Sequence, residues 1–120
     1  MLTYQTIHEL CHAASHAGTT ISQVILSDQA QQLGLEEQEV RSQMARRLQV
    51  MEESVRTGMD PELRSTSGLS GGDAAKMMSY AQGGGICGLF VNQAIARALA
   101  TSECNAAMGK IVAAPTAGSC

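Results

Sequence analysis

Residues whose types suit catalysis or ligand binding are concentrated in two stretches of this 120-residue sequence. The first, residues 65–73, reads STSGLSGGD and is rich in hydroxyl groups and glycines. Glycines expose backbone amides, and the segment DAAKMM that begins at Asp73 is predicted to start a helix, whose N-terminus carries partial positive charge. This stretch therefore predicts an ordered loop that can bind an anion such as a substrate carboxylate.

The second stretch, residues 105–120, reads NAAMGKIVAAPTAGSC and ends in a cysteine. We expect a short helical turn over residues 103–108, an apolar extended run over 111–114, and then a turn that proline fixes. A thiol delivered at the end of a rigid segment can bind a soft metal ion. We therefore expect Ser67 and Cys120 to lie side by side in one centre, with the rest of the chain as helical scaffold.

Another group of possible metal ligands lies near the N-terminus. His8, Cys11, His12 and His16 follow one another at helical spacing, so they share one helix face and could ligate zinc or iron. The alternative is a solvated edge of three histidines beside a buried cysteine. Cysteines that bind no metal are usually small core residues, which is our expectation for Cys87 and Cys104.

Composition narrows the class of protein. The formal net charge is −3 and the pI is about 5.5, and no basic stripe with interleaved aromatic residues is present, so we expect no nucleic-acid partner. We expect neither a signal peptide nor a membrane span, because no charged segment leads into a long apolar run. Four widely spaced cysteines are typical of free thiols in a reducing cytoplasm.

Hydrophobic periodicity predicts an all-α fold, a helical bundle with a Ser/Gly-rich loop and a short extended C-terminal segment. The sequence has no Trp, one Phe and seven Met, so aliphatic side chains must fill the interior. Glycines and a change of periodicity delimit the helices. They are predicted over residues 3–17, about 20–33, about 36–57, from 73 onward, and from 87 or 88 to about 100.

Two of these predicted helices carry the apolar residues that we expect in the core. In the helix over residues 36–57 they form one stripe, made of Val40, Met44, Leu48, Met51 and Val55. The last helix is apolar on more than one face, through Leu89, Phe90, Val91, Ile95, Ala98 and Leu99. We expect this last helix to be central and Thr101 and Ser102 to interrupt it.

The sequence contains three motifs in a fixed order: STSGLSGGD at 65–73, NAAMG at 105–109 and APTAGSC at 114–120. Together they resemble the motifs of the iron-sulfur-dependent L-serine dehydratases, and most closely the alpha chain of the two-subunit bacterial type. The resemblance implies a helical catalytic domain with a 4Fe-4S cluster held by three cysteines. One iron, left open, would act as a Lewis acid on the serine hydroxyl while a base removes the alpha proton, which leads to pyruvate and ammonia.

The same resemblance implies roles for individual residues. It assigns the substrate carboxylate to Ser65, Thr66, Ser67 and Gly68, and the lining of the pocket to Asn105 and Thr116. Cys120 would be the first cluster ligand. The candidates for the group that takes the alpha proton are Ser67 and Lys76, and the alternative for Lys76 is a surface lysine or an ion pair with an acid.

The alpha chain of this family continues well beyond the position of Cys120 and carries its other cluster cysteines there. The resemblance therefore implies that residues 1–120 are the N-terminal part of an alpha-chain catalytic domain, with L-serine as substrate and a beta subunit as partner. We expect this part alone to be inactive. Two alternatives stay open: a noncatalytic helical interaction module, and a small helical metal-binding protein that uses His8, Cys11 and His12.

Overall fold

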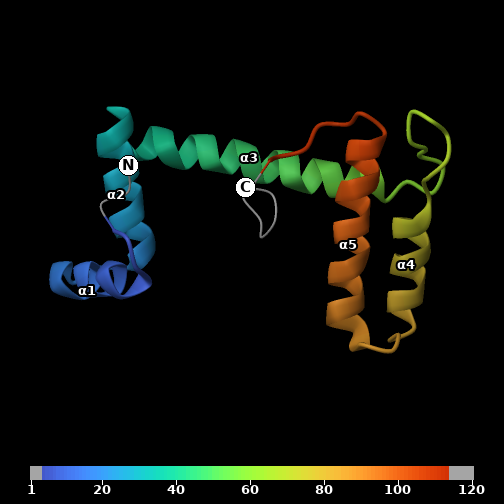
Figure 1. Ribbon diagram of the computed structural model, residues 1–120, viewed down its shortest axis with the longest axis horizontal. Coiled ribbons are helices and arrows are strands. Elements are labelled where there is room, and N and C mark those ends of the chain that lie inside the picture. The colour runs from blue at the N-terminus through green and yellow to red at the C-terminus, as the bar shows by residue number, and fades with distance from the viewer. Residues whose placement is uncertain (1–3, 114–120) are drawn as a thin grey trace. The chain divides into compact units, whose positions relative to one another are not determined.

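The computed structural model describes residues 4–113, and its regular elements are all helices (Figure 1). These helices are α1 (Ile7–Ala17), α2 (Ile21–Leu33), α3 (Glu37–Gly58), α4 (Asp73–Gln82) and α5 (Gly88–Ala106). The predicted all-α fold is confirmed. The chain divides into two compact units, Met1–Arg46 and Arg47–Cys120, and α3 begins in the first and ends in the second. Within residues 4–113, none of the helices combines the length and the hydropathy that crossing a membrane requires.

In the first unit, α1 and α2 begin and end at residues that satisfy their terminal backbone groups. The hydroxyl of Thr6 accepts a hydrogen bond from the N–H three residues later at 3.2 Å, and Thr20 does the same at 3.3 Å. Gly18 and Gly34 end the two helices in the left-handed conformation, with φ of 62° and 65°. The predicted stops are confirmed, but α1 begins later than predicted because Thr6 is its cap.

The expected core stripe of α3 is largely exposed. Met44, Leu48 and Met51 have exposed fractions of 57%, 55% and 38%, and the residues of this helix that are fully buried are Ser54 and Gly58. The prediction that the large apolar side chains of α3 form the core is therefore wrong for the described chain. Burial on this helix goes to the small residues near its C-terminal end, because they allow another segment to approach closely.

In the second unit, α4 and α5 run side by side in opposite directions and form the main packed element (Figure 1). The buried residues of α4 are alanines, Ala74 and Ala81. The buried residues of α5 lie four positions apart and are Asn92, Ala96, Ala100 and Cys104. Residues at this spacing form a single helix face, so the contact between the two helices is made by a stripe of small side chains.

The large apolar side chains of α5 point away from this contact. Leu89, Phe90, Val91 and Ile95 are between 40% and 85% exposed. The expectation that these residues make α5 central is therefore wrong. Small residues form the interface because they permit a short distance between helix axes, and a single partner helix covers only one face of α5.

Side-chain hydrogen bonds fix the turn between α4 and α5. The buried side chain of Asn92 donates from Nδ2 to the carbonyl oxygen of Gly84 at 3.2 Å, and the hydroxyl of Tyr80 accepts from the N–H of Ile86 at 2.9 Å. A Cβ atom at Gly85, where φ is +54°, would lie 2.1 Å from Asn92 Nδ2. Gly85, one of the glycines predicted to break the chain here, is thus needed for a tight turn.

α5 continues through the residues that were expected to interrupt it. The hydroxyl of Thr101 donates to the carbonyl oxygen of Arg97, one turn earlier, at 3.2 Å, so it is satisfied inside the helix. The helix ends at Ala106, and Met108 follows in the left-handed conformation with φ of 63°. Gly109 then donates to the carbonyl oxygen of Cys104 at 2.8 Å. Residues 109–113 have no regular secondary structure, and the rest of the expected extended segment lies outside the described residues.

Gly58, at the end of α3, is the glycine whose replacement should most disturb the second unit. A Cβ atom there would lie 1.7 Å from the carbonyl oxygen of Ala100, in the middle of α5. Alanine gains about 1 kcal/mol over glycine in helix propensity, whereas overpacking of this kind costs about 1–3 kcal/mol and occasionally more. We expect Gly58→Ala to lower the free energy of unfolding by up to about 2 kcal/mol in net terms, as measured by denaturant titration followed by circular dichroism.

Gly83→Ala is the matched control, because a Cβ atom at Gly83 meets only the carbonyl oxygen of Tyr80 at an ordinary 3.5 Å and φ is −80°. We expect this variant to unfold at nearly the denaturant concentration of the parent chain. Equal midpoints for the Gly58 and Gly83 variants would contradict the close approach of α3 to α5.

Candidate functional site

The predicted Ser/Gly-rich loop, residues 65–72, is closed by its own hydrogen bonds. The backbone N–H of Ser65 donates to the carbonyl oxygen of Ser70 at 2.9 Å, and the N–H of Gly68 donates to the carbonyl oxygen of Ser65 at 2.8 Å. The N–H of Ser70 in turn donates to the Ser65 hydroxyl at 3.2 Å. Gly68 takes φ of +76°, which favours glycine. The loop therefore has a defined conformation, as its position before α4 predicted.

The hydroxyl groups of the loop differ in their availability to a ligand. Those of Ser65 and Ser67 are hydrogen-bonded to each other at 3.1 Å, and Ser67 Oγ also accepts from the N–H of Leu69 at 3.4 Å. The hydroxyl of Thr66 is exposed and has no hydrogen bond to any residue in the described part of the chain. The backbone N–H of Ser67 likewise has no hydrogen bond to any described residue. Both donors, at the loop tip, are therefore available to a ligand within the described structure.

The loop lies beside the C-terminal end of α5. The N–H of Thr66 donates to the carbonyl oxygen of Ala106 at 3.2 Å, and Figure 1 shows the loop at the end of the hairpin where α5 finishes. This contact brings the first motif next to Asn105, whose side chain is exposed. The structure therefore brings together two of the three sequence motifs, although some forty residues separate them.

The N-terminus of α4, predicted as an anion site, is occupied by a carboxylate of the protein itself. Glu103 Oε1, on α5, accepts hydrogen bonds from the backbone N–H groups of Asp73 at 2.8 Å and Ala74 at 3.3 Å. The cap residue Gly72 has no side chain to satisfy them. The expectation that this helix end is open to a substrate carboxylate is therefore wrong, and the loop tip is the part of the motif that stays accessible.

Sequence reasoning missed Glu103, because nothing in its local sequence distinguishes it from other helix glutamates. Its other oxygen, Oε2, is buried and has no hydrogen-bond partner among the described residues. A capping residue normally precedes its helix by one position, whereas this one follows Asp73 by thirty. The one available signal was the glycine at the cap position, which leaves the first N–H groups of α4 in need of an acceptor.

The glycines at the base of the loop serve the chain's own packing. A Cβ atom at Gly71 would lie 2.0 Å from the carbonyl oxygen of Leu63, and one at Gly72 would lie 3.2 Å from that of Pro61. The guanidinium of Arg64 donates to both of these carbonyl oxygens, at 2.8 and 2.9 Å. The glycines therefore allow the loop to return close to residues 61–64 before α4 begins.

The two candidates for a proton acceptor have ordinary surroundings. Lys76 is exposed on α4, and its ammonium group forms an ion pair with Asp73, one turn earlier, at 3.8 Å. This is the arrangement that the alternative interpretation of Lys76 described. Ser67 is hydrogen-bonded to another serine, and no histidine or carboxylate of the described residues contacts its hydroxyl. The catalytic roles of both residues stay predictions.

The described cysteines do not form a ligand set for an iron-sulfur cluster. Cys87 is exposed at the start of α5, and Cys104 is buried in its last turns, so a continuous helix separates them by roughly 25 Å. The expectation that Cys87 is a core residue is wrong, and that for Cys104 is confirmed. Cys120 and Thr116, the other predicted site residues, lie outside the described residues, so the juxtaposition of Cys120 with Ser67 stays a prediction.

The histidines of α1 are not arranged as a metal site. His8, His12 and His16 are exposed, and Cys11, expected to be buried beside them, is exposed as well. The rings of His12 and His16 are stacked with centroids 6.4 Å apart. No group of three His, Cys, Asp or Glu side chains within residues 4–113 has a geometry that could hold a metal ion. This arrangement removes the support for a metal-binding function of the first helix.

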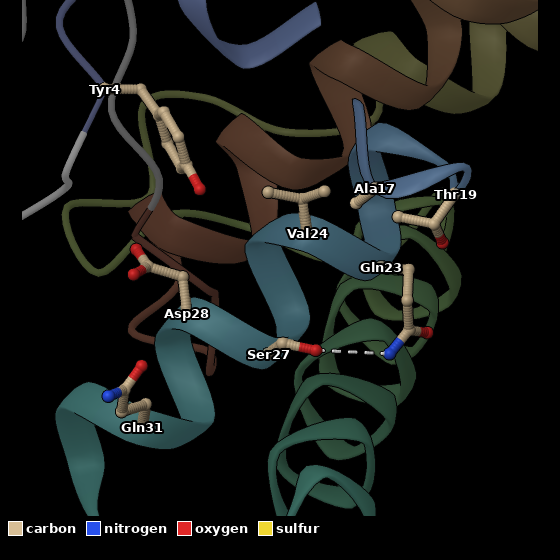
Figure 2. Close-up of a pocket in the computed structure, with 8 residues that line it drawn as sticks. All are labelled: Tyr4, Ala17, Thr19, Gln23, Val24, Ser27, Asp28 and Gln31. Carbon is tan, nitrogen blue, oxygen red and sulfur yellow. Dashed lines mark hydrogen bonds between the residues drawn. The ribbon is translucent and has the colours of Figure 1, made fainter. Parts of the chain in front are cut away.

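The first unit contains a surface pocket of about 290 Å³ (Figure 2). Its lining comes from the N-terminal segment and from α1 and α2, and consists of Tyr4, Ala17, Thr19, Gln23, Val24, Ser27, Asp28 and Gln31. Two polar side chains of this pocket are hydrogen-bonded to Glu37. Gln23 Nε2 donates to Glu37 Oε2 at 2.8 Å, and the Ser27 hydroxyl donates to Glu37 Oε1. Two of the lining side chains therefore also join α2 to the first residue of α3.

These contacts lower the pKa of Glu37 below its ordinary value of 4.5. The largest cause is the hydrogen bond from Ser27, followed by the one from Gln23, and the positive charge of Arg41 acts in the same direction. A carboxyl group with a lowered pKa in the folded state contributes stability that is present above its unfolded pKa and is lost as the pH falls through its folded pKa. The joint between α2 and α3 should therefore weaken in acid.

We expect an NMR titration to give Glu37 a pKa below 4.5. The stability of the first unit should fall as the pH drops through this lowered pKa of the folded state. Glu37→Gln should remove this pH dependence. Glu36→Gln is the matched control, because Glu36 is exposed and has no such partners. An ordinary pKa for Glu37, or equal effects of the two substitutions on acid stability, would contradict the assigned hydrogen bonds.

Comparison with known proteins agrees with the motif pattern. The sequence model of the family described as "Serine dehydratase alpha chain" matches residues 16–120. The chain is 35% identical over 117 residues to the "Probable L-serine dehydratase, alpha chain" of Bacillus subtilis (strain 168), which is 97% of this chain and 39% of that protein. It is 34% identical over 115 residues to the "L-serine dehydratase, alpha chain" of Peptoniphilus asaccharolyticus, with coverages of 95% and 39%.

No solved structure matches the chain. The chain spans about two fifths of the length of the curated relatives that it matches, 39% of each. The family match nevertheless covers most of the chain, including the loop and the C-terminal motifs. The chain therefore belongs to the serine dehydratase alpha-chain family.

Proposed function

We propose that this chain is part of the alpha subunit of an L-serine dehydratase and that its loop binds the substrate carboxylate. Family membership supports the reaction, because both relatives are named as L-serine dehydratase alpha chains. The single observation that carries the site is the hydrogen bond between Thr66 and Ala106, at 3.2 Å, which joins the loop to the segment that contains Asn105. Two motifs expected to contact one substrate are thereby neighbours.

Within this proposal the substrate carboxylate binds at the loop tip. The Thr66 hydroxyl and the Ser67 N–H are donors that no group within residues 4–113 uses, and a carboxylate can accept from both. The Ser65 hydroxyl orients Ser67 through their mutual hydrogen bond. Gly68 gives the loop its left-handed turn, and Asn105 contributes an amide from the side of α5. Thr116 would complete the lining.

The reaction removes the alpha proton and the beta hydroxyl of L-serine as water. The resulting enamine rearranges and hydrolyses to pyruvate and ammonia. Ser67 is the nearest candidate for the proton acceptor, because it lies in the loop itself, and Lys76 is the second. A lyase of this kind would act in amino-acid degradation and gluconeogenesis in the cytoplasm, where thiols stay reduced.

The proposal includes a 4Fe-4S cluster, with Cys120 as the ligand that this chain provides. The cluster would supply Lewis acidity toward the substrate hydroxyl. Its other ligands would come from outside residues 1–120, because Cys87 and Cys104 are held at opposite ends of α5. The catalytic unit would also contain a beta subunit, so activity requires more protein than this chain contains.

A noncatalytic interaction module remains the second candidate function. The observation in its favour is the exposure of Leu89, Phe90, Val91 and Ile95 on α5, since exposed apolar clusters mark interaction surfaces. The same exposure is expected of one part of a larger enzyme. Activity of the complete protein distinguishes the two.

We test the substrate loop with Thr66→Val in the complete two-subunit enzyme. A hydrogen bond to a charged group is worth about 1.5–3 kcal/mol, so its loss should raise KM for L-serine roughly 10- to 100-fold. The kcat value should change less, because the carboxylate is not the reacting group. Ser70→Ala is the matched control, since the Ser70 hydroxyl in the same loop has no assigned role. An unchanged KM for the Thr66 variant in an active enzyme would contradict the site.

We expect the 120-residue chain alone, after anaerobic reconstitution with iron and sulfide, to form no pyruvate from L-serine. Cys87 and Cys104, at opposite ends of α5, lie too far apart to share a cluster. The complete alpha and beta chains, reconstituted in parallel, are the positive control. Four irons per chain together with pyruvate formation by the short chain would refute this expectation, and zinc bound by the first helix would revive the metal-binding alternative.

A further inference from the structure

The Ser/Gly-rich loop is attached to α5 at two points that lie about one helical turn apart. At its start, the N–H of Thr66 donates to the carbonyl oxygen of Ala106 at 3.2 Å. At its end, the N–H groups of Asp73 and Ala74 donate to the carboxylate of Glu103 at 2.8 and 3.3 Å. Positions 103 and 106 are three residues apart and share one face of α5. The loop is therefore held against a single face of that helix.

The two attachments differ in what can replace them. The first uses a backbone carbonyl, which every residue has, whereas the second depends on a side chain. The first N–H groups of α4 need an acceptor. A residue with a side chain at position 72 would have to adopt φ of +81°, and its Cβ atom would lie 3.2 Å from the carbonyl oxygen of Pro61. A side chain at Gly71 would clash with the carbonyl oxygen of Leu63 at 2.0 Å. A side chain at Gly71 or Gly72 therefore cannot take over from Glu103 without strain.

The second carboxylate oxygen of Glu103 gives a further reason to assign this residue a role. Oε2 is buried without a hydrogen-bond partner among the described residues, and an unsatisfied buried acceptor normally has a structural or functional reason. A carboxyl group held this way lies at the positive end of the α4 dipole. A glutamine of the same shape could keep the oxygen at the Oε1 position as an acceptor while it removes the charge.

We propose that Glu103 is a positioning residue for the substrate loop. It sets the location of Thr66 and Ser67 relative to Asn105 by anchoring the start of α4, and it does not contact the substrate itself. This inference rests on the proposed function for its effect on L-serine, but its structural part can be tested without activity. It also explains why the substrate carboxylate binds at the loop tip, since the N-terminus of α4 already holds a carboxylate.

The structural part is tested by hydrogen exchange of backbone amides in this chain. We expect Glu103→Ala to accelerate exchange at Asp73, Ala74 and Thr66, and Glu103→Gln to stay close to the parent chain, because the amide oxygen still accepts. Asn92→Ala is the control, since it removes a buried hydrogen bond at the opposite end of the same hairpin and should accelerate exchange at the α4–α5 turn. Unchanged exchange at the loop in Glu103→Ala, or acceleration spread evenly over α4 and α5, would overturn the proposal.

The functional part is tested by the kinetics of the same variants in the complete enzyme. We expect Glu103→Ala to raise KM for L-serine about tenfold or more, with a smaller change in kcat, because a displaced loop loses hydrogen bonds to the substrate. Glu103→Gln should restore KM, and Asn92→Ala should leave KM unchanged although it weakens the hairpin. A normal KM in Glu103→Ala would overturn the positioning role. A parent enzyme without activity on L-serine would instead refute the proposed function, and hydrogen exchange would still decide the role of Glu103.

Discussion

Close contact between α4 and α5 through small side chains is the constraint on which the second unit depends. Alanines and one cysteine line the interface, and Ala100 leaves so little room that the neighbouring residue of α3 must be Gly58. A short distance between helix axes lets side chains on one helix reach the backbone ends of the other. Glu103, next to Cys104 on α5, can therefore accept hydrogen bonds from the first residues of α4. The position of the Ser/Gly-rich loop follows from this contact.

The same contact contributes little hydrophobic energy. Burial is worth about 0.8 kcal/mol for each group the size of a methyl, so the four alanines of the interface supply about 3 kcal/mol before entropy is subtracted. The larger side chains on α5, such as Leu89 and Phe90, would each contribute about 1.5–3 kcal/mol if they were covered. Most of the hydrophobic surface that this sequence offers is thus unused in the described chain.

The loop shows how a glycine-rich motif can differ in function along its length. Its base, at Gly71 and Gly72, allows close packing against residues 61–64 and a helix start without a local cap. Its tip, at Thr66 and Ser67, keeps two donors without a hydrogen-bond partner in the described part of the chain. Only the tip is suited to a ligand. A motif that looked uniform in sequence therefore divides into a base that serves packing and an exposed tip, where the proposed function places the substrate carboxylate.

The sequence by itself determined the helical class, the stops at Gly18 and Gly34, the start of α4 at Asp73 and the order of the motifs, because these depend on local periodicity and on backbone conformation. It also pointed to the family, since the motifs are contiguous stretches. It did not predict which face of α5 is buried, because apolar residues cover several faces and only the partner helix selects the small ones. The role of Glu103 likewise required the tertiary structure, since a cap thirty residues from its helix start leaves no trace in local sequence.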